Sequence, residues 1–270
     1  MQKIVVIKIG TSSITKNCEE GIDLNIVQDL AQASAKIIAA GFKVIIVSSG
    51  AMSLGQARLG TKHLETQLGV NPCKSKLTVY KQALTSIGQV ELMKHYQEYF
   101  AQLNLEVGQV LVTHSGIKDE HRNSNLKETL EKMFELNIVP IVNANDTVSP
   151  KEIVVGDNDS LAARISILIS AEKLFLLTDV DGVYDKDPFK NDDAKHFSEI
   201  EVIDDKLLKL AGESESKVGT GGMKSKLNSA KICQAKNIHV EILDARHCFD
   251  LEKFVLEKDH SIKSTTILPS

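Results

Sequence analysis

The sequence predicts an α/β protein that has a largely parallel central sheet with helices on both faces. Short β-branched segments recur along the 270 residues and have the character of buried strands. Longer segments with apolar side chains at helical spacing separate them. Strands that alternate with helices of about ten or more residues form βαβ crossovers, which produce a parallel sheet covered on both sides.

The alternation starts at the N-terminus. Ile4 to Ile9 is β-branched and ends at Gly10, which predicts a buried strand. Asn25 to Ala40 has helical spacing, and Gly41 follows where a C-cap glycine belongs. We then predict a strand at Val44 to Val47, a helix from about Lys76 to Phe100, a strand at Val107 to Val112, a helix at Asn123 to Leu136 and a strand at Ile138 to Val142.

The second half continues the pattern after an interruption at Pro150. Short β-like runs between Thr147 and Val155 flank this proline and predict a hairpin. The elements that follow are a helix at Asn158 to Ser170, a strand at Leu174 to Leu177, a short helix at Asp204 to Ala211, a helix at Met223 to Lys236 and a strand at His239 to Leu243. We expect Thr265 to Leu268 to form a last strand at the edge of the sheet.

Composition excludes several classes of protein. A chain that is 42% hydrophobic can bury a substantial core, and a formal charge of −4 with mixed signs argues against a nucleic-acid binder. No apolar run approaches the roughly 20 residues of a membrane helix, and lysines interrupt the apolar N-terminus, so we expect neither a membrane segment nor a signal peptide. The cysteines lack zinc-ligand spacing and are interpreted as reduced thiols of a cytoplasmic protein; they are Cys18, Cys73, Cys233 and Cys248.

In such a sheet, ligands bind beyond the carboxyl ends of the strands, so the residues after each strand carry the information about function. The first strand ends in Lys8, Ile9 and Gly10, followed by three hydroxyl residues. A lysine inside a β-branched strand is costly to bury without an anion. Lys8 is therefore either exposed at the edge of the sheet or a ligand of a phosphate group.

Polar residues also follow the next strands. Ser48-Ser49-Gly50-Ala51 could form a tight turn or a loop whose N–H groups approach an anion. Asn143 to Asp146 follows a later strand, and Gly156-Asp157-Asn158-Asp159 opens a helix. One of Asp157 or Asn158 is expected to cap this helix, but three such residues in a row exceed what capping needs.

Two segments imitate familiar ligand loops without matching them. Asp179-Val180-Asp181-Gly182 resembles the start of a calcium loop, but Lys190 stands where the EF-hand pattern requires a glutamate. The stretch VGTGGMKSK, Val218 to Lys226, approaches the Walker A pattern but has Val218 and Met223 in place of its two glycines. The helix that follows this stretch still offers N–H groups and a dipole to an anion.

Lysines, glycine turns and carboxylates at one edge of a sheet suit phosphoryl transfer. Lys8, Lys224 and Lys226 supply the positive charge, and no Ser/His/Asp or Cys/His set suggests nucleophilic catalysis instead. The residues alone therefore predict an α/β phosphotransferase without a Walker loop.

Six segments in order resemble the amino acid kinase family, and together they cover essentially the whole chain: VVIKIGTSSI, IIVSSGAMSLG, PIVNANDTV, VVGDNDSLAA, LFLLTDVDGVYDKDP and GTGGMKSKL. The resemblance implies a three-layer αβα sandwich in one domain, 1–270, with an acceptor-binding lobe at 1–170 and an ATP-binding lobe at 171–270. GDND and TGGMxxK favour the members that phosphorylate the γ-carboxylate of L-glutamate, the first step of proline biosynthesis. The alternatives are a relative acting on N-acetylglutamate, aspartate or carbamate, or a non-catalytic amino-acid sensor.

Matching the motifs residue by residue implies a set of site residues. Lys8 and Lys226 would stabilise the transferring phosphoryl group, and Asp159 would position both lysines. The implied substrate-binding residues are Ser49, Gly50, Asp146, Asp157 and Asn158. The implied ATP-binding residues are Lys8, Gly10, Thr178, Asp179, Thr220, Gly221, Gly222, Met223, Lys224, Ser225 and Lys226. Mg²⁺ is expected to accompany ATP, with no protein ligand assigned to it.

The resemblance also implies partners and location. We expect a cytoplasmic homodimer or homotetramer that binds L-glutamate and ATP and passes its product to glutamyl-phosphate reductase. Many family members carry a C-terminal PUA domain, which resembles RNA-binding domains; because the sequence ends at Ser270, soon after the kinase region, we expect no such domain here. Phe189 follows Asp187-Pro188 where an arginine is common in the family.

Overall fold

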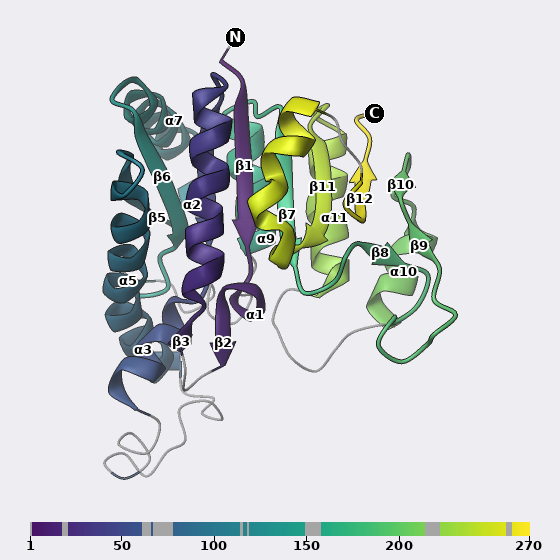
Figure 1. Ribbon diagram of the computed structural model, residues 1–270, viewed down its shortest axis with the longest axis horizontal. Helices are drawn as coiled ribbons and strands as arrows, with labels where there is room; N and C mark the ends of the chain where they lie inside the picture. The colour runs from purple at the N-terminus through teal and green to yellow at the C-terminus, as the bar shows by residue number, and fades with distance from the viewer. Residues whose placement is uncertain are drawn as a thin grey trace.

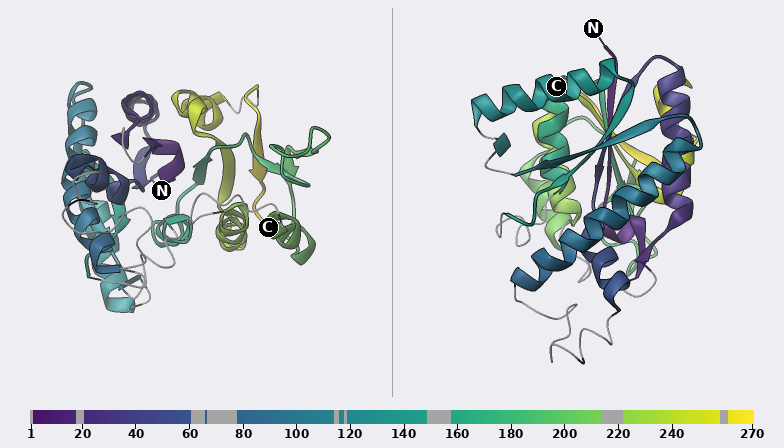
Figure 2. Two further views of the ribbon diagram at one scale, coloured as in Figure 1. Left: turned by 90° about the horizontal axis from the view of Figure 1, so that it is seen from below. Right: turned by 90° about the vertical axis from the view of Figure 1, so that its left-hand side faces the viewer.

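A single large sheet forms the centre of the protein in a computed structural model. The structure describes residues 2–17, 21–60, 66, 78–113, 116–117, 119–148, 158–213, 222–257 and 261–270. The eight strands of the sheet have the order β10-β12-β11-β7-β1-β4-β6-β5. Neighbouring strands are parallel except for the β11 and β12 pair. Helices lie on both faces of this sheet, as Figure 2 shows, so the predicted three-layer sandwich is confirmed.

Seven of the eight strands of this sheet lie where the sequence predicts strands, and the short strand β10 was not predicted. The strands are β1 (Ile4–Ile9), β4 (Lys43–Ser48), β5 (Glu106–Val112), β6 (Ile138–Ala144), β7 (Lys173–Thr178), β10 (Glu199–Ile200), β11 (His239–Asp244) and β12 (Ser264–Ile267). Two small antiparallel pairs lie outside it, namely β2 (Thr15–Asn17) with β3 (Gly21–Ile22) and β8 (Val183–Tyr184) with β9 (His196–Phe197).

The helices are α1 (Thr11–Ile14), α2 (Leu24–Ala39), α3 (Ala51–Leu59), α5 (Thr78–Ala101), α7 (Glu120–Glu135), α9 (Asn158–Leu168), α10 (Asp205–Glu213) and α11 (Met223–Gln234), with a 3₁₀-helix η1 (Ala245–Asp250) and a π-helix η2 (Lys253–Glu257). Six of the helices correspond to predicted ones, whereas α1, α3 and the 3₁₀- and π-helices were not predicted. Among the described residues, none of these helices is long and apolar enough to cross a bilayer.

Two predictions about the elements need correction. The strand β12 is not at the edge of the sheet, because the two-residue strand β10 pairs with its outer side. The helix α7 begins earlier than predicted, because the Asp119 carboxylate accepts a hydrogen bond from the backbone N–H of Arg122 at 2.9 Å and caps the helix there. The hairpin predicted between Thr147 and Val155 extends outside the described residues.

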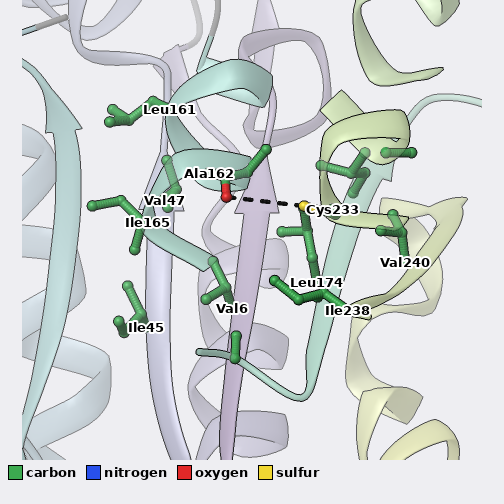
Figure 3. Close-up of a cluster of buried hydrophobic side chains, with 14 of the residues drawn as sticks. Val6, Ile45, Val47, Leu161, Ala162, Ile165, Leu174, Cys233, Ile238 and Val240 are labelled. Carbon is green, nitrogen blue, oxygen red and sulfur yellow. Dashed lines mark hydrogen bonds between the residues drawn. The ribbon is translucent and has the colours of Figure 1, made fainter. Parts of the chain in front are cut away.

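The side chains of the central strands alternate between two cores. Val6 of β1 faces a cluster formed with α7, α9 and α11, while its neighbours Val5 and Ile7 face a cluster formed with α2, α5 and η1. Figure 3 shows the first cluster, where Ile165 of α9 and Cys233 of α11 lie over the sheet. Burying an aliphatic side chain of this size contributes about 1.5–3 kcal/mol. The two cores therefore hold the sheet rigidly between its helical layers.

The topology brings the carboxyl ends of β1, β4, β6, β7 and β11 to one edge of the sheet, because these strands are all parallel. This is the lower edge in Figure 1, where α1 directly follows β1. The helices α3, α9 and α11 begin next to it. The residues singled out from the sequence therefore meet at this edge.

Candidate active site

A buried carboxylate joined to two lysines lies at the centre of this edge. Asp159, in the first turn of α9, contacts Lys8 of β1 with 2.5 Å between Oδ1 and Nζ. Its other oxygen, Oδ2, accepts a hydrogen bond from Lys226 Nζ of α11 at 3.3 Å. The three residues are only 4%, 1% and 5% exposed for Lys8, Asp159 and Lys226. The alternative, that Lys8 is exposed on an outermost strand of the sheet, is wrong, because β1 lies between β7 and β4.

Burial and charge oppose each other in this cluster. Burial alone would raise the pKa of Asp159, but the nearby ammonium groups of Lys8 and Lys226 hold that pKa below its ordinary value. Burial lowers the pKa of Lys226, and the positive charge of Lys8 lowers it further, while the carboxylate of Asp159 counteracts both. One carboxylate therefore keeps two buried lysines together, and the cluster carries a net positive charge that suits an anionic ligand.

A second hydrogen-bonded group lies beside the first. The side-chain amide nitrogen of Asn158 lies 2.8 Å from Ser49 Oγ, 3.0 Å from Asn143 Oδ1 and 3.2 Å from the Ser48 carbonyl oxygen. These acceptors belong to the carboxyl ends of β4 and β6. Asn158 therefore ties the start of α9 to two strand ends.

Asn143 was not among the residues assigned from the sequence. It is 5% exposed, and its side-chain oxygen also accepts the backbone N–H of Ala144 at 2.8 Å. Behind it, Tyr96 of α5 donates a hydrogen bond to Ser48 Oγ at 3.0 Å. The position of Asn143 at the end of a predicted strand was the available signal, whereas no sequence pattern connects Tyr96 to this edge.

Glycines occupy the two turns beside Lys8, and the backbone conformation of one of them requires glycine. Gly50 begins α3 with φ of 97°, and a Cβ atom there would lie 2.9 Å from Ile14 Cγ2. Gly10 ends β1, and a Cβ atom on it would lie 3.4 Å from Lys8 Nζ. The backbone N–H of Ser49 donates to the Ile9 carbonyl at 3.1 Å, which holds the two turns against each other. The backbone at Gly10 thus comes close to the Lys8 ammonium group without a side chain between them.

The ends of β7 and α11 complete the edge. Thr178 closes β7, and its hydroxyl donates to Asp179 Oδ1 at 3.1 Å. Gly222 precedes α11, and its carbonyl accepts the backbone N–H groups of Ser225 at 3.0 Å and Lys226 at 3.3 Å. Within this helix Lys226 is buried, whereas Lys224 is exposed to solvent.

The remaining assigned residues are Asp146, Met223, Asp157, Thr220 and Gly221. Asp146 follows β6, and its backbone carbonyl accepts a hydrogen bond from Gln82 of α5 at 3.0 Å, which fixes this loop to the helix. Met223 is the first residue of α11 and packs against the core. Asp157, Thr220 and Gly221 lie outside the described residues.

Among the described residues, the thiols and carboxylates elsewhere do not form a second centre of this kind. Cys233 and Cys248 are free and buried, and burial raises the pKa of both thiols. In the part of the chain that the structure describes, no group of three or more histidine, cysteine or acidic residues has the arrangement of a metal site.

Two lysines on one carboxylate, at the carboxyl edge of a parallel sheet, are the arrangement expected of a phosphotransferase. The chain belongs to the amino acid kinase family, whose sequence profile matches residues 3–244.

Glutamate 5-kinases from several bacteria are among its relatives. The chain is 38% identical to glutamate 5-kinase from Shewanella oneidensis over 254 residues. This aligned region covers 94% of this chain and 65% of that protein. The chain is 35% identical over 242 residues to the enzyme from Pasteurella multocida, with 90% and 63% covered. It is 40% identical over 238 residues to glutamate 5-kinase 1 from Bacillus licheniformis, with 88% and 62% covered. The chain thus spans slightly less than two thirds of the length of these relatives.

Solved structures share the fold at lower identity. UMP kinase from Ureaplasma parvum superposes with a TM-score of 0.64 at 19% identity, covering 99% of each chain. An isopentenyl phosphate kinase superposes with a TM-score of 0.60 at 20% identity, covering 98% of this chain and 99% of the other. At such identities the likeness concerns the fold alone.

Proposed function

We propose that the protein is an ATP-dependent glutamate 5-kinase, which converts L-glutamate to L-glutamyl 5-phosphate. The observation that carries the proposal is the buried cluster of Lys8, Asp159 and Lys226 beside the Asn158 and Ser49 pair. The identity to glutamate 5-kinases over nearly the whole chain supports L-glutamate as the acceptor. The reaction is the first step of proline biosynthesis, and its product would pass to glutamyl-phosphate reductase.

The chemistry needs little beyond positioning and positive charge. A γ-carboxylate oxygen of glutamate attacks the γ-phosphorus of ATP, the bond from that phosphorus to the bridging oxygen breaks, and ADP leaves. The carboxylate is already ionised at neutral pH, so no general base has to remove a proton. The barrier is the repulsion between two anions, which Lys8 and Lys226 lower by facing the transferring phosphoryl group. Asp159 holds both ammonium groups in place for this role.

The substrates would occupy two sides of the cluster. Glutamate would lie toward β4 and β6, where Asn158 contacts Ser49, the neighbour of Gly50. We assign Asp146, and Asp157 of the same motif, to the same substrate. ATP would lie toward β7 and α11, between Gly10, Thr178, Asp179 and the residues from Thr220 to Lys226. The division corresponds to an acceptor lobe at 1–170 and an ATP lobe at 171–270.

Magnesium would arrive as part of the substrate MgATP, where it neutralises phosphate charge. In the described residues, the carboxylates of Asp159 and Asp179 both raise the pKa of Lys226 against the effect of burial, and Asp159 is committed to the two lysines. We therefore assign the lysines, rather than a metal held by the protein, to the transferring group. We further propose a cytoplasmic homodimer or homotetramer.

Acyl phosphate trapping tests this function directly. The protein is incubated with MgATP, hydroxylamine and, in separate reactions, L-glutamate, N-acetylglutamate, aspartate or carbamate; acyl phosphates appear as hydroxamates. We expect hydroxamate and ADP only with L-glutamate. Preference for another acceptor would assign the protein to that branch of the family. Glutamate binding without ADP release would indicate a sensor and would refute the proposal.

A further inference from the structure

An arginine that the family motifs do not assign lies at the end of β11. In the pairing of β11 with β7, Asp244 at the end of β11 lies opposite Thr178, the last residue of β7. Figure 1 shows β7 and β11 side by side, with both carboxyl ends at the edge that carries the lysine cluster. Arg246 follows two residues later, in the first turn of η1. It therefore adjoins the segment on which we propose that ATP binds.

The guanidinium of Arg246 is held in a fixed orientation by a buried carboxylate. Its Nε lies 2.9 and 3.0 Å from the two carboxylate oxygens of Asp244, and its Nη2 lies 2.5 Å from Oδ2. Asp244 is 2% exposed, whereas the side chain of Arg246 is 82% exposed. A guanidinium has five N–H donors, so this geometry commits one edge of the group and leaves the other edge open to solvent.

Acidic side chains predominate at the carboxyl ends of β7 and β11, so a phosphate bound there would need a cation beside it. The segment after β7 carries Asp179 and Asp181, which would repel phosphate groups lying over it. Lys263 neutralises Asp181 at 3.0 Å, and Arg246 lies within electrostatic reach of the same carboxylate. Lys8 and Lys226 both contact Asp159, which holds their ammonium groups near the end of β1. A cation on the β11 side is what a bound polyphosphate would still need.

The spacing of the sheet indicates which phosphates Arg246 would reach. The strand β11 is two positions away from β1 in the strand order, or about 10 Å at the usual separation of neighbouring strands. The transferring phosphoryl group belongs next to Lys8 on β1. Arg246, two residues after the end of β11, is thus placed for the phosphates that remain with ADP.

We infer that Arg246 is a nucleotide-contacting residue, which binds the α- and β-phosphates of ATP with the open edge of its guanidinium while Asp244 holds the other edge. The inference rests on the proposed function, because it assumes a nucleotide over Thr178 and Asp179. Planar guanidinium groups match phosphate oxygens with two parallel hydrogen bonds, which a lysine cannot do. In this role Asp244 is a positioning residue.

A purely structural role for Arg246 makes a different prediction. Asp244 also accepts the backbone N–H of Arg246 at 2.8 Å, so the pair closes the start of η1 as a cap. If this were the whole role, Arg246→Ala would lower the melting temperature and leave nucleotide affinity unchanged. The two roles are therefore separated by measuring nucleotide binding and thermal unfolding on the same variants.

Calorimetric titration of the full chain with MgADP, in the absence of any acceptor, tests the inference. Arg246→Ala is expected to weaken MgADP binding about tenfold or more, because hydrogen bonds between charged groups are stronger than those between neutral groups. Arg246→Lys is expected to be intermediate. The matched control is Arg58→Ala, because Arg58 is an exposed arginine of α3 that pairs with Glu91 at 3.5 Å, and it should bind MgADP like the wild type.

Wild-type affinity in Arg246→Ala would overturn the inference, whatever its melting temperature. An equal loss in Arg58→Ala would also overturn it, because net charge alone would then explain the effect. The proposed function fails in a different experiment: wild-type protein that binds MgADP but forms no glutamate-dependent hydroxamate. Because the titration contains no acceptor, the two failures can be distinguished.

Discussion

Replacing Asp159 with asparagine would remove the charge that holds two buried lysines while preserving the shape of the side chain. Lys8 and Lys226 are 4% and 5% exposed, so two ammonium groups would remain in a nearly dry site without a counter-charge. Breaking a buried ion pair in this way costs about 3–5 kcal/mol of the free energy of unfolding. The pKa of Lys226, already lowered by burial and by Lys8, would fall further without Asp159. A neutral or displaced lysine no longer stabilises the phosphoryl group, and we expect kcat to fall about 10²–10³-fold.

Urea unfolding and the hydroxamate assay measure the two effects on the same sample. The matched control is Glu241→Gln, which neutralises another fully buried carboxylate, one that accepts hydrogen bonds from Ser264 and Thr266 and lies 3.9 Å from Lys173. Glu241→Gln should lose stability and retain kcat. If Asp159→Asn kept the wild-type kcat, or if both variants lost kcat equally, the assignment of Asp159 to the lysine cluster would be refuted.

Three further predictions concern the same edge of the sheet. Lys226→Ala should lose far more kcat than Lys224→Ala, because only Lys226 is buried against Asp159, and equal losses would contradict the geometry. Asn158→Ala should raise KM for glutamate more than KM for MgATP, because Asn158 contacts Ser49 on the proposed acceptor side; initial rates at varied substrate measure this, with exposed Asn125→Ala of α7 as the control. The lowered pKa of Lys226 implies that kcat falls as the pH rises, at values below the ordinary lysine pKa of 10.5. At pH values below the lowered pKa of Lys226 in the folded protein, the lysine is charged and activity should be retained. A pH profile in which kcat does not fall between neutral pH and pH 10.5 would refute this prediction.

Periodicity predicts the central part of the fold because the strands are buried on both faces. Residues such as Val5 and Val6 face different cores, yet both require apolar side chains, so the strand appears as one β-branched run. The short elements could not be predicted, because they have no local pattern of apolar residues. The strand β10 contains only Glu199 and Ile200, and it exists because β12 offers it an unpaired edge. Tertiary contact, rather than local pattern, forms such an element.

The same contrast applies to the candidate site. Lys8 is conspicuous in the sequence because a charge interrupts a buried strand, and the structure places it against Asp159. Lys226 could be preferred over Lys224 only through the resemblance, since both lysines follow the same glycines and the helical phase at the end of a loop is not fixed by sequence. Asn143 and Tyr96 act through hydrogen bonds between distant segments, which leave no periodic signal.

The first turn of α9 explains how one short motif can serve both substrates. Asn158 and Asp159 are consecutive, and successive residues of an α-helix point about 100° apart. Asn158 consequently reaches Ser49 and Asn143 at the ends of β4 and β6, whereas Asp159 reaches Lys8 on β1 and Lys226 on α11. Acceptor and phosphoryl group must approach to about 3–3.5 Å for transfer, and a helical turn fixes such a separation better than a loop does. The proposed glutamate side and the lysine cluster are thus aligned by the backbone of a single helix, whose buried side chains Leu161 and Ile165 anchor it to the sheet.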